Sequence, residues 1–157
     1  MTNPFDFSTG QILTAAQLNQ IGDYDSWTPT LTNVTLGNGT VNAHYAVVNE
    51  IVHFEIEFQV GSTTSFSSTS MQFSLPSDAL YGGGLQYDVV GGGWAFPQGS
   101  AIYSIQTLVI ESTDRVVPYA MIATGTYTQP AAVRGSSIPE AWNSSGKMFM
   151  NGTYRAA

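Results

Sequence analysis

The stretch V-N-A-H-Y-A-V-V-N-E-I-V-H-F-E-I-E-F-Q-V, residues 41 to 60, decides the fold. Apolar and polar residues alternate on both sides of Asn49-Glu50, which predicts two half-buried strands, 41–48 and 51–60. A two-residue turn at Asn49-Glu50 places Val48 opposite Ile51. That turn fixes every later pair, because the side chains of a strand repeat with a period of two.

This register sorts the side chains of the hairpin into two faces. One face holds only apolar pairs: Val47–Val52, Tyr45–Phe54, Ala43–Ile56 and Val41–Phe58. The other face holds the pairs Ala46–His53, His44–Glu55 and Asn42–Glu57. We therefore expect an antiparallel sheet with one face in the core and the other in solvent.

Weaker strand patterns continue to the end of the chain, at 31–36, 72–75, 85–90, 101–110, 116–123 and 147–155. Glycine and serine mark the expected turns and loops, at Gly37-Asn38-Gly39 (a hairpin turn), 62–70, 82–84 and 91–93. Short strands with regularly spaced turn signals favour a sandwich or barrel. The sequence thus predicts a mostly β fold, an antiparallel β-sandwich or jelly-roll head over residues 27–157.

The first 26 residues differ and predict an N-terminal arm followed by a short helix. Residues 1–10 show neither a helical nor a strand period. Thr14 to Ile21 predicts a two-turn helix, with a Thr14–Gln17 capping box and a stop at Gly22. So short a helix needs a partner surface, on its own domain or on another chain. The predicted anchor residues are the apolar side chains of this unit: Phe5, Phe7, Leu13, Leu18 and Ile21.

The chain is polar without being charged. Charged residues make up 10%, with 4 basic against 11 acidic residues and a formal net charge of -7. So few cations argue against nucleic acid and against anionic membrane surfaces as partners. The absence of cysteine excludes disulfides and thiolate metal sites. The sequence also predicts neither a signal peptide nor a membrane span.

Few residues suggest chemistry. His44 and His53, the only histidines, share the polar face with Glu55 and Glu57, and imidazole with carboxylate is a metal-ligand set. The favoured interpretation is a solvated face with a His44–Glu55 cross-strand pair. A third interpretation is that this face contacts another subunit. No nucleophile-elbow spacing occurs and no carboxylate pair stands out. We therefore expect no enzyme, no catalytic or metal site and no cofactor.

Aromatic residues lie in or near segments rich in glycine, serine and asparagine. Rings beside neutral hydrogen-bonding groups suit sugars, whose C–H faces stack while their hydroxyls bond. The alternative is packing in the core or at its rim. The candidate glycan contacts are Tyr81, Tyr87, Trp94, Tyr103 and Trp142.

Several short phrases, taken in order, resemble a recurrent module of tailed-bacteriophage structural proteins. They are Trp27-Thr28-Pro29-Thr30-Leu31-Thr32, Leu36-Gly37-Asn38-Gly39-Thr40-Val41, Tyr45, Ile51-Val52-His53-Phe54, Gly61-Ser62-Thr63-Thr64 and the closing Asn151-Gly152-Thr153-Tyr154-Arg155-Ala156. The phrase at residues 10–19 is similar to the short helical lead of such modules in phages of actinobacteria. Residues 78–145 match least.

The resemblance implies a homotrimeric β head on an N-terminal anchor that contacts other virion proteins. Such modules sit on the virion as minor tail or tail-fibre proteins, often for host attachment through a cell-surface glycan. Similar heads also decorate capsids, so a decoration protein bound through its arm is the alternative. An enzyme acting on cell-surface polysaccharide is less favoured.

Overall fold

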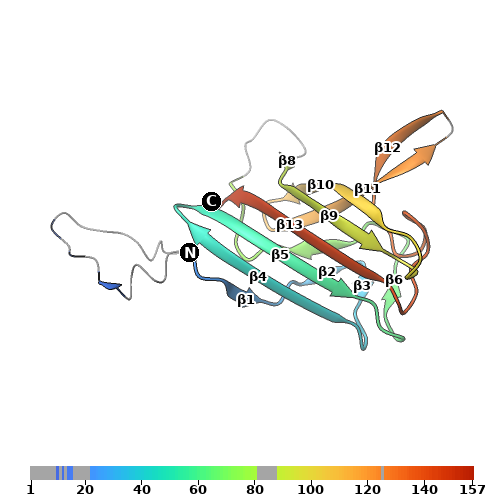
Figure 1. The fold of residues 1–157 in the computed structure, drawn as a ribbon, viewed down its shortest axis with the longest axis horizontal. Coiled ribbons are helices and arrows are strands. Elements are labelled where there is room, and N and C mark those ends of the chain that lie inside the picture. Colours follow the sequence, from blue (N-terminus) through green and yellow to red (C-terminus); the bar gives the residue numbers. More distant parts are fainter. Residues whose placement is uncertain (1–9, 11, 13, 16–21, 81–87, 125) are drawn as a thin grey trace.

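The computed structural model describes residues 10, 12, 14–15, 22–80, 88–124 and 126–157, and this part of the chain is mostly antiparallel β (Figure 1). The strands are β1 Asp25–Trp27, β2 Leu31–Thr32, β3 Val34–Thr35, β4 Thr40–Val48, β5 Ile51–Gln59, β6 Ser65–Phe66, β7 Gln72–Ser74, β8 Asp88–Val89, β9 Gly91–Phe96, β10 Tyr103–Ser112, β11 Arg115–Thr124, β12 Tyr127–Ala132 and β13 Lys147–Arg155. The predicted β class is confirmed.

The β4–β5 hairpin has the predicted register from Thr40–Gln59 to Val48–Ile51. Asn49 and Glu50 both have positive φ angles, 49° and 66°, as a tight type I′ turn requires. The apolar face is in the core, where Phe54 and Phe58 are at most 2% exposed. The polar face is outward, as predicted, although Ala46 on it is buried.

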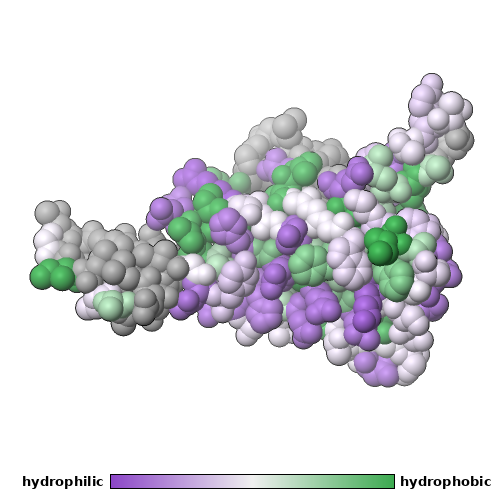
Figure 2. All heavy atoms as spheres, in the orientation of Figure 1, coloured by the Kyte–Doolittle hydropathy of each residue, from purple (hydrophilic) through white to green (hydrophobic). Residues whose placement is uncertain are grey.

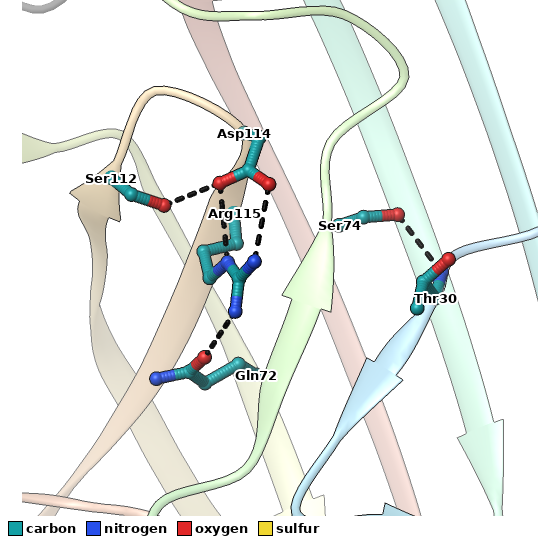
Figure 3. Close-up of polar contacts among 6 residues, drawn as sticks. All are labelled: Thr30, Gln72, Ser74, Ser112, Asp114 and Arg115. Carbon is teal, nitrogen blue, oxygen red and sulfur yellow. Dashed lines mark hydrogen bonds and ion pairs between the residues drawn. The ribbon is translucent and has the colours of Figure 1, made fainter.

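The main sheet curls until its two ends meet. Its order is β1-β4-β5-β13-β9-β10-β11-β7-β2, so β1 and β2 are its outermost strands, yet only residues 28–30 separate them in sequence. Trp27 Nε1 donates to the Ser74 carbonyl oxygen at 3.4 Å. Thr30 N donates to Ser74 Oγ at 2.9 Å (Figure 3). Ser74 N donates to the Thr30 carbonyl oxygen at 3.0 Å. The segment around Pro29 therefore joins both ends of the sheet.

The core lies inside this curl and centres on Phe58. Its ring is 5.9 Å from that of Phe73, 6.1 Å from that of Trp142 and 6.4 Å from that of Phe66, centroid to centroid. Met148 and Met150 of β13 are fully buried beside it. Burial of this cluster supplies the main driving force for folding.

The prediction of a loop at Gly91-Gly92-Gly93 was wrong. These residues begin β9, which lies between β13 and β10. A Cβ on Gly91 would overlap the carbonyl oxygen of Asn151, and a Cβ on Gly93 would overlap that of Phe149. Glycine is needed here because two backbones approach closely inside a sheet, not because the chain turns.

Other local predictions also need correction. The strand 31–36 breaks at Asn33, whose φ is 67°, and its halves pair with different strands, β7 and β6. Leu36–Gly39 does form a turn, but β3 and β4 on either side of it do not pair with each other. The predicted loop 62–70 contains β6, whose Phe66 packs against the core. Strand β12 was missed.

The predicted N-terminal helix and anchor lie almost wholly outside the described residues. Of the helix 14–21, only Thr14 and Ala15 are described, and none of the five predicted anchor residues is. Arm, helix and anchor therefore stay predictions. Within the described ranges, no helix is long and apolar enough to cross a membrane.

Candidate functional site

The outward face of β5, β13, β9 and β10 carries two neighbouring aromatic rings. Met148 and Met150 point into the core, so Phe149 between them points outward. Phe149 lies opposite Glu57 on one side and Trp94 on the other, and Trp94 lies opposite Ser104. With Asn42 opposite Glu57, these five residues form one row across the sheet. We call this row the aromatic platform.

The two rings of the platform are nearly parallel. Their centroids are 6.4 Å apart and their planes differ by 25°, which is an offset stack. The offset leaves part of each ring face uncovered. Trp94 is 40% exposed, whereas Phe149 is half-buried. The strand backbones hold both rings, so the platform does not depend on loop conformation.

Three uncharged hydrogen-bonding side chains lie on the same face as the two rings. Asn42, Ser104 and Asn151 are exposed on the same face, and Asn151 lies opposite Gly92. Gly92, two residues before Trp94 on the same face, therefore places no side chain beside Asn151. Figure 2 views this face and shows hydrophilic side chains gathered over β4 and β5. The arrangement can offer a stacking surface with donors and acceptors at its edge.

The predicted aromatic contacts fall into three groups. Trp94 is exposed, on a strand rather than in a loop. Tyr103 is half-buried against the core, and Trp142 is only 8% exposed between Phe58 and Phe66, so for these two the alternative of core packing applies. Tyr81 and Tyr87 lie outside the described residues.

Phe149 was missed by the sequence analysis, although its signal was present. In K-M-F-M-N-G-T-Y-R, residues 147–155, the two methionines are buried and alternate with Lys147, Phe149 and Asn151. A phenylalanine in the polar phase of an alternating strand indicates an outward ring. Only the pairing of β13 with β9 then places it beside Trp94.

The histidines lie where the hairpin register predicts. His44 is opposite Glu55, and His53 Nδ1 lies 3.0 Å from Thr153 Oγ1 on β13. Among the described residues, no three histidine, aspartate or glutamate side chains converge as metal ligands would. This part of the face offers hydrogen bonds between strands.

A second polar cluster joins the β10–β11 turn to β7 (Figure 3). Arg115 Nε and Nη2 donate to the two carboxylate oxygens of Asp114 at 3.1 and 3.2 Å, and Nη1 donates to Gln72 Oε1 at 3.0 Å. Ser112 Oγ donates to Asp114 Oδ1 at 2.5 Å. The Arg115 and Ser112 hydrogen bonds lower the pKa of Asp114 from 3.8 to about 2. The cluster positions a turn.

Replacing Asp114 with asparagine tests this cluster. Because the pKa of Asp114 is lowered in the fold, its contribution is full above about pH 4 and is lost as the pH falls towards 2. Both partners are more than one-third exposed, so we expect D114N to cost less than about 1 kcal/mol at pH 7. Urea unfolding at pH 7, 4 and 2.5 should show the difference from wild type shrinking in acid. A difference that stays constant would contradict this assignment.

Comparison of the chain with protein-family models, with curated proteins and with solved structures gave no match. The candidate site is thus defined by its geometry and by the sequence.

Proposed function

We propose that the chain is a structural protein of a tailed-phage virion, of the minor tail or tail-fibre type, whose β head attaches to a host-surface glycan. The observation that carries the proposal is the exposed Trp94–Phe149 stack on a strand-supported face. The head would be a β-sandwich or jelly roll, trimeric and anchored to other virion proteins through residues 1–26. The protein would act by binding, without catalysis.

The chemistry of the platform supports a sugar ligand. A pyranose ring has an apolar C–H face that packs on an aromatic ring, while its hydroxyls project from its edge. Asn42 and Asn151 each offer a donor and an acceptor, and Ser104 offers a hydroxyl. Aromatic side chains with a few placed polar groups are typical of ligand sites.

The phrases that carry the phage resemblance have structural roles that suit a shared scaffold. Trp27-Thr28-Pro29-Thr30 joins the two ends of the sheet, as described above. Asn38 hydrogen-bonds to Thr63 of the Gly61–Thr64 phrase at 2.9 Å. In the closing phrase, Gly152 leaves room for the ring of Phe54, because a Cβ on Gly152 would lie only 2.7 Å from that ring. These contacts would form a scaffold on which the platform is displayed.

Replacing Trp94 with alanine is expected to weaken binding to host-surface polysaccharide about 10- to 30-fold, the typical effect of removing an aromatic hot spot. The fold should be retained, because the side chain is 40% exposed. Binding is measured on purified host cell-wall polysaccharide, with melting temperature as the check on folding. The matched control is Tyr127→Ala, which removes a ring that is 79% exposed on β12, away from the platform.

Two outcomes would contradict the proposal. One is a W94A protein that binds host polysaccharide as tightly as wild type. The other is a folded wild-type protein that ignores host cells but coats the capsid in many copies. The second outcome would favour capsid decoration instead, and deletion of residues 1–10 should then release the protein from the shell.

A further inference from the structure

We infer that the aromatic platform selects neutral sugars and rejects anionic polysaccharides. This inference rests on the proposed function and specifies the ligand class of the same site. It follows from the charges that the sheet register places around Trp94 and Phe149.

On the β5 side, the two rings have carboxylates as neighbours, one within the platform and one beside it. Glu57 is the direct cross-strand neighbour of Phe149, and Glu55 lies two residues along the same face. The ion pairs of the described residues are Asp114–Arg115 and Glu50–Arg155, so neither carboxylate is in one. A phosphate or carboxylate of a ligand would therefore meet like charges at the rim.

The cations near the platform are too few to reverse this effect. Lys147, the only lysine of the chain, lies two residues from Phe149 on the same face. Arg155, at the far end of β13, already donates to Glu50 Oε2 at 2.9 and 3.1 Å. The formal net charge of the whole chain is -7. Anion sites in proteins instead gather several cationic or N–H donors.

The same carboxylate helps a neutral ligand. Glu57 is exposed beside the half-buried Phe149 ring, where it can accept hydrogen bonds from sugar hydroxyls. Hydrogen bonds to a charged acceptor are about twice as strong as neutral ones. Asn42 lies opposite Glu57 and extends this hydrogen-bonding edge. The platform would thus bind a neutral sugar ring by stacking, while Glu57 accepts hydrogen bonds from the sugar hydroxyls.

The experiment uses the full chain with two sets of probes. The neutral set is dextran, galactan, mannan and chitohexaose, and the anionic set is polygalacturonate and polyglycerol phosphate. Binding is measured at 50 and 500 mM NaCl. We expect at least one neutral probe to bind with an affinity that salt leaves unchanged, and the anionic probes to bind at least about tenfold more weakly at low salt.

Glu57→Gln provides the second arm. Loss of the charged acceptor should weaken binding of the neutral probe several-fold. At 50 mM NaCl it should also reduce the difference in affinity between the neutral and the anionic probes. The control Glu50→Gln makes the same charge change at the hairpin turn, away from the platform. It should change neither the affinity for the neutral probe nor the affinity for the anionic probes. Salt-sensitive binding of an anionic probe at least as tight as the neutral binding would overturn the inference alone. Binding of no neutral probe by wild type would also overturn the inference, whereas only a failure to bind host-surface polysaccharide as well would overturn the proposed function.

Discussion

Replacement of Trp142 by alanine is expected to lower the free energy of unfolding by about 3–5 kcal/mol, the usual cost of truncating a buried tryptophan. The side chain is 8% exposed, and its ring centroid is 6.1 Å from that of Phe58 and 6.3 Å from that of Phe66. The backbone of Gly146 also packs closely against the indole of Trp142, since a Cβ on Gly146 would lie 2.9 Å from it. The rings of Phe58 and Phe66 would face a cavity.

Urea unfolding of wild type, W142A and W142F measures this cost. Phenylalanine keeps an aromatic ring in the core and removes the buried indole Nε1–H, which has no hydrogen-bond partner among the described residues, so W142F should lose less stability than W142A. The matched comparison is W94A, the same substitution on the platform. W94A should lose glycan binding with little loss of stability, whereas W142A should lose stability and keep binding where it is folded. Equal destabilisation by the two alanine variants would contradict these assignments.

The β4–β5 hairpin was predictable because its signals are local. Alternation over residues 41–60 sets the faces, and Asn49-Glu50 sets the register, so every pair from Thr40–Gln59 to Val48–Ile51 follows from adjacent sequence. The last strand, 147–155, also has the predicted bounds, because buried Met148 and Met150 alternate with polar residues. Local pattern was sufficient for these three strands, each of which has one face in the core and one in solvent.

The arrangement of the sheet was not predictable, because its pairs are distant in sequence. Lys147 of β13 lies opposite Gln59 of β5, and Leu31 of β2 lies opposite Phe73 of β7. Which strands become neighbours depends on how the curled sheet fills its core, and no motif in the sequence predicts these pairings. The candidate site depends on the same choice, since Trp94 and Phe149 meet only where β9 pairs with β13.

For a related reason, the sequence could not separate the exposed ring of Trp94 from the buried ring of Trp142. Composition around Trp94 and Trp142 is similar, with glycine, serine or asparagine close to each ring. Exposure separates them, 40% against 8%, and exposure depends on whether Phe58 and Phe66 cover the ring. Glycine-rich composition likewise indicates loops in general, but in β9 it reflects close approach of two strand backbones.

Gly93→Val tests that interpretation of the glycines, and we expect it to destabilise the fold by more than about 3 kcal/mol, the upper end of overpacking in well-packed sites. Gly93 lies opposite Met150 on one side and Ile105 on the other. A Cβ there would overlap the carbonyl oxygen of Phe149 and lie 2.9 Å from the Met150 Cα. These are backbone atoms of a central strand, so no side-chain rotation can relieve the overlap.

The control is Trp94→Val, which introduces the same β-branched residue at the next position, on the outward face. Valine there has room and a high strand propensity, so W94V should unfold at nearly the wild-type urea concentration. If residues 91–93 were a surface loop, G93V would cost within about 0.5 kcal/mol, as surface substitutions usually do. Because β9 is the strand that joins β13 to β10, G93V should also disturb the Trp94–Phe149 stack. A folded G93V protein with wild-type stability would therefore contradict both the strand register and the platform built on it.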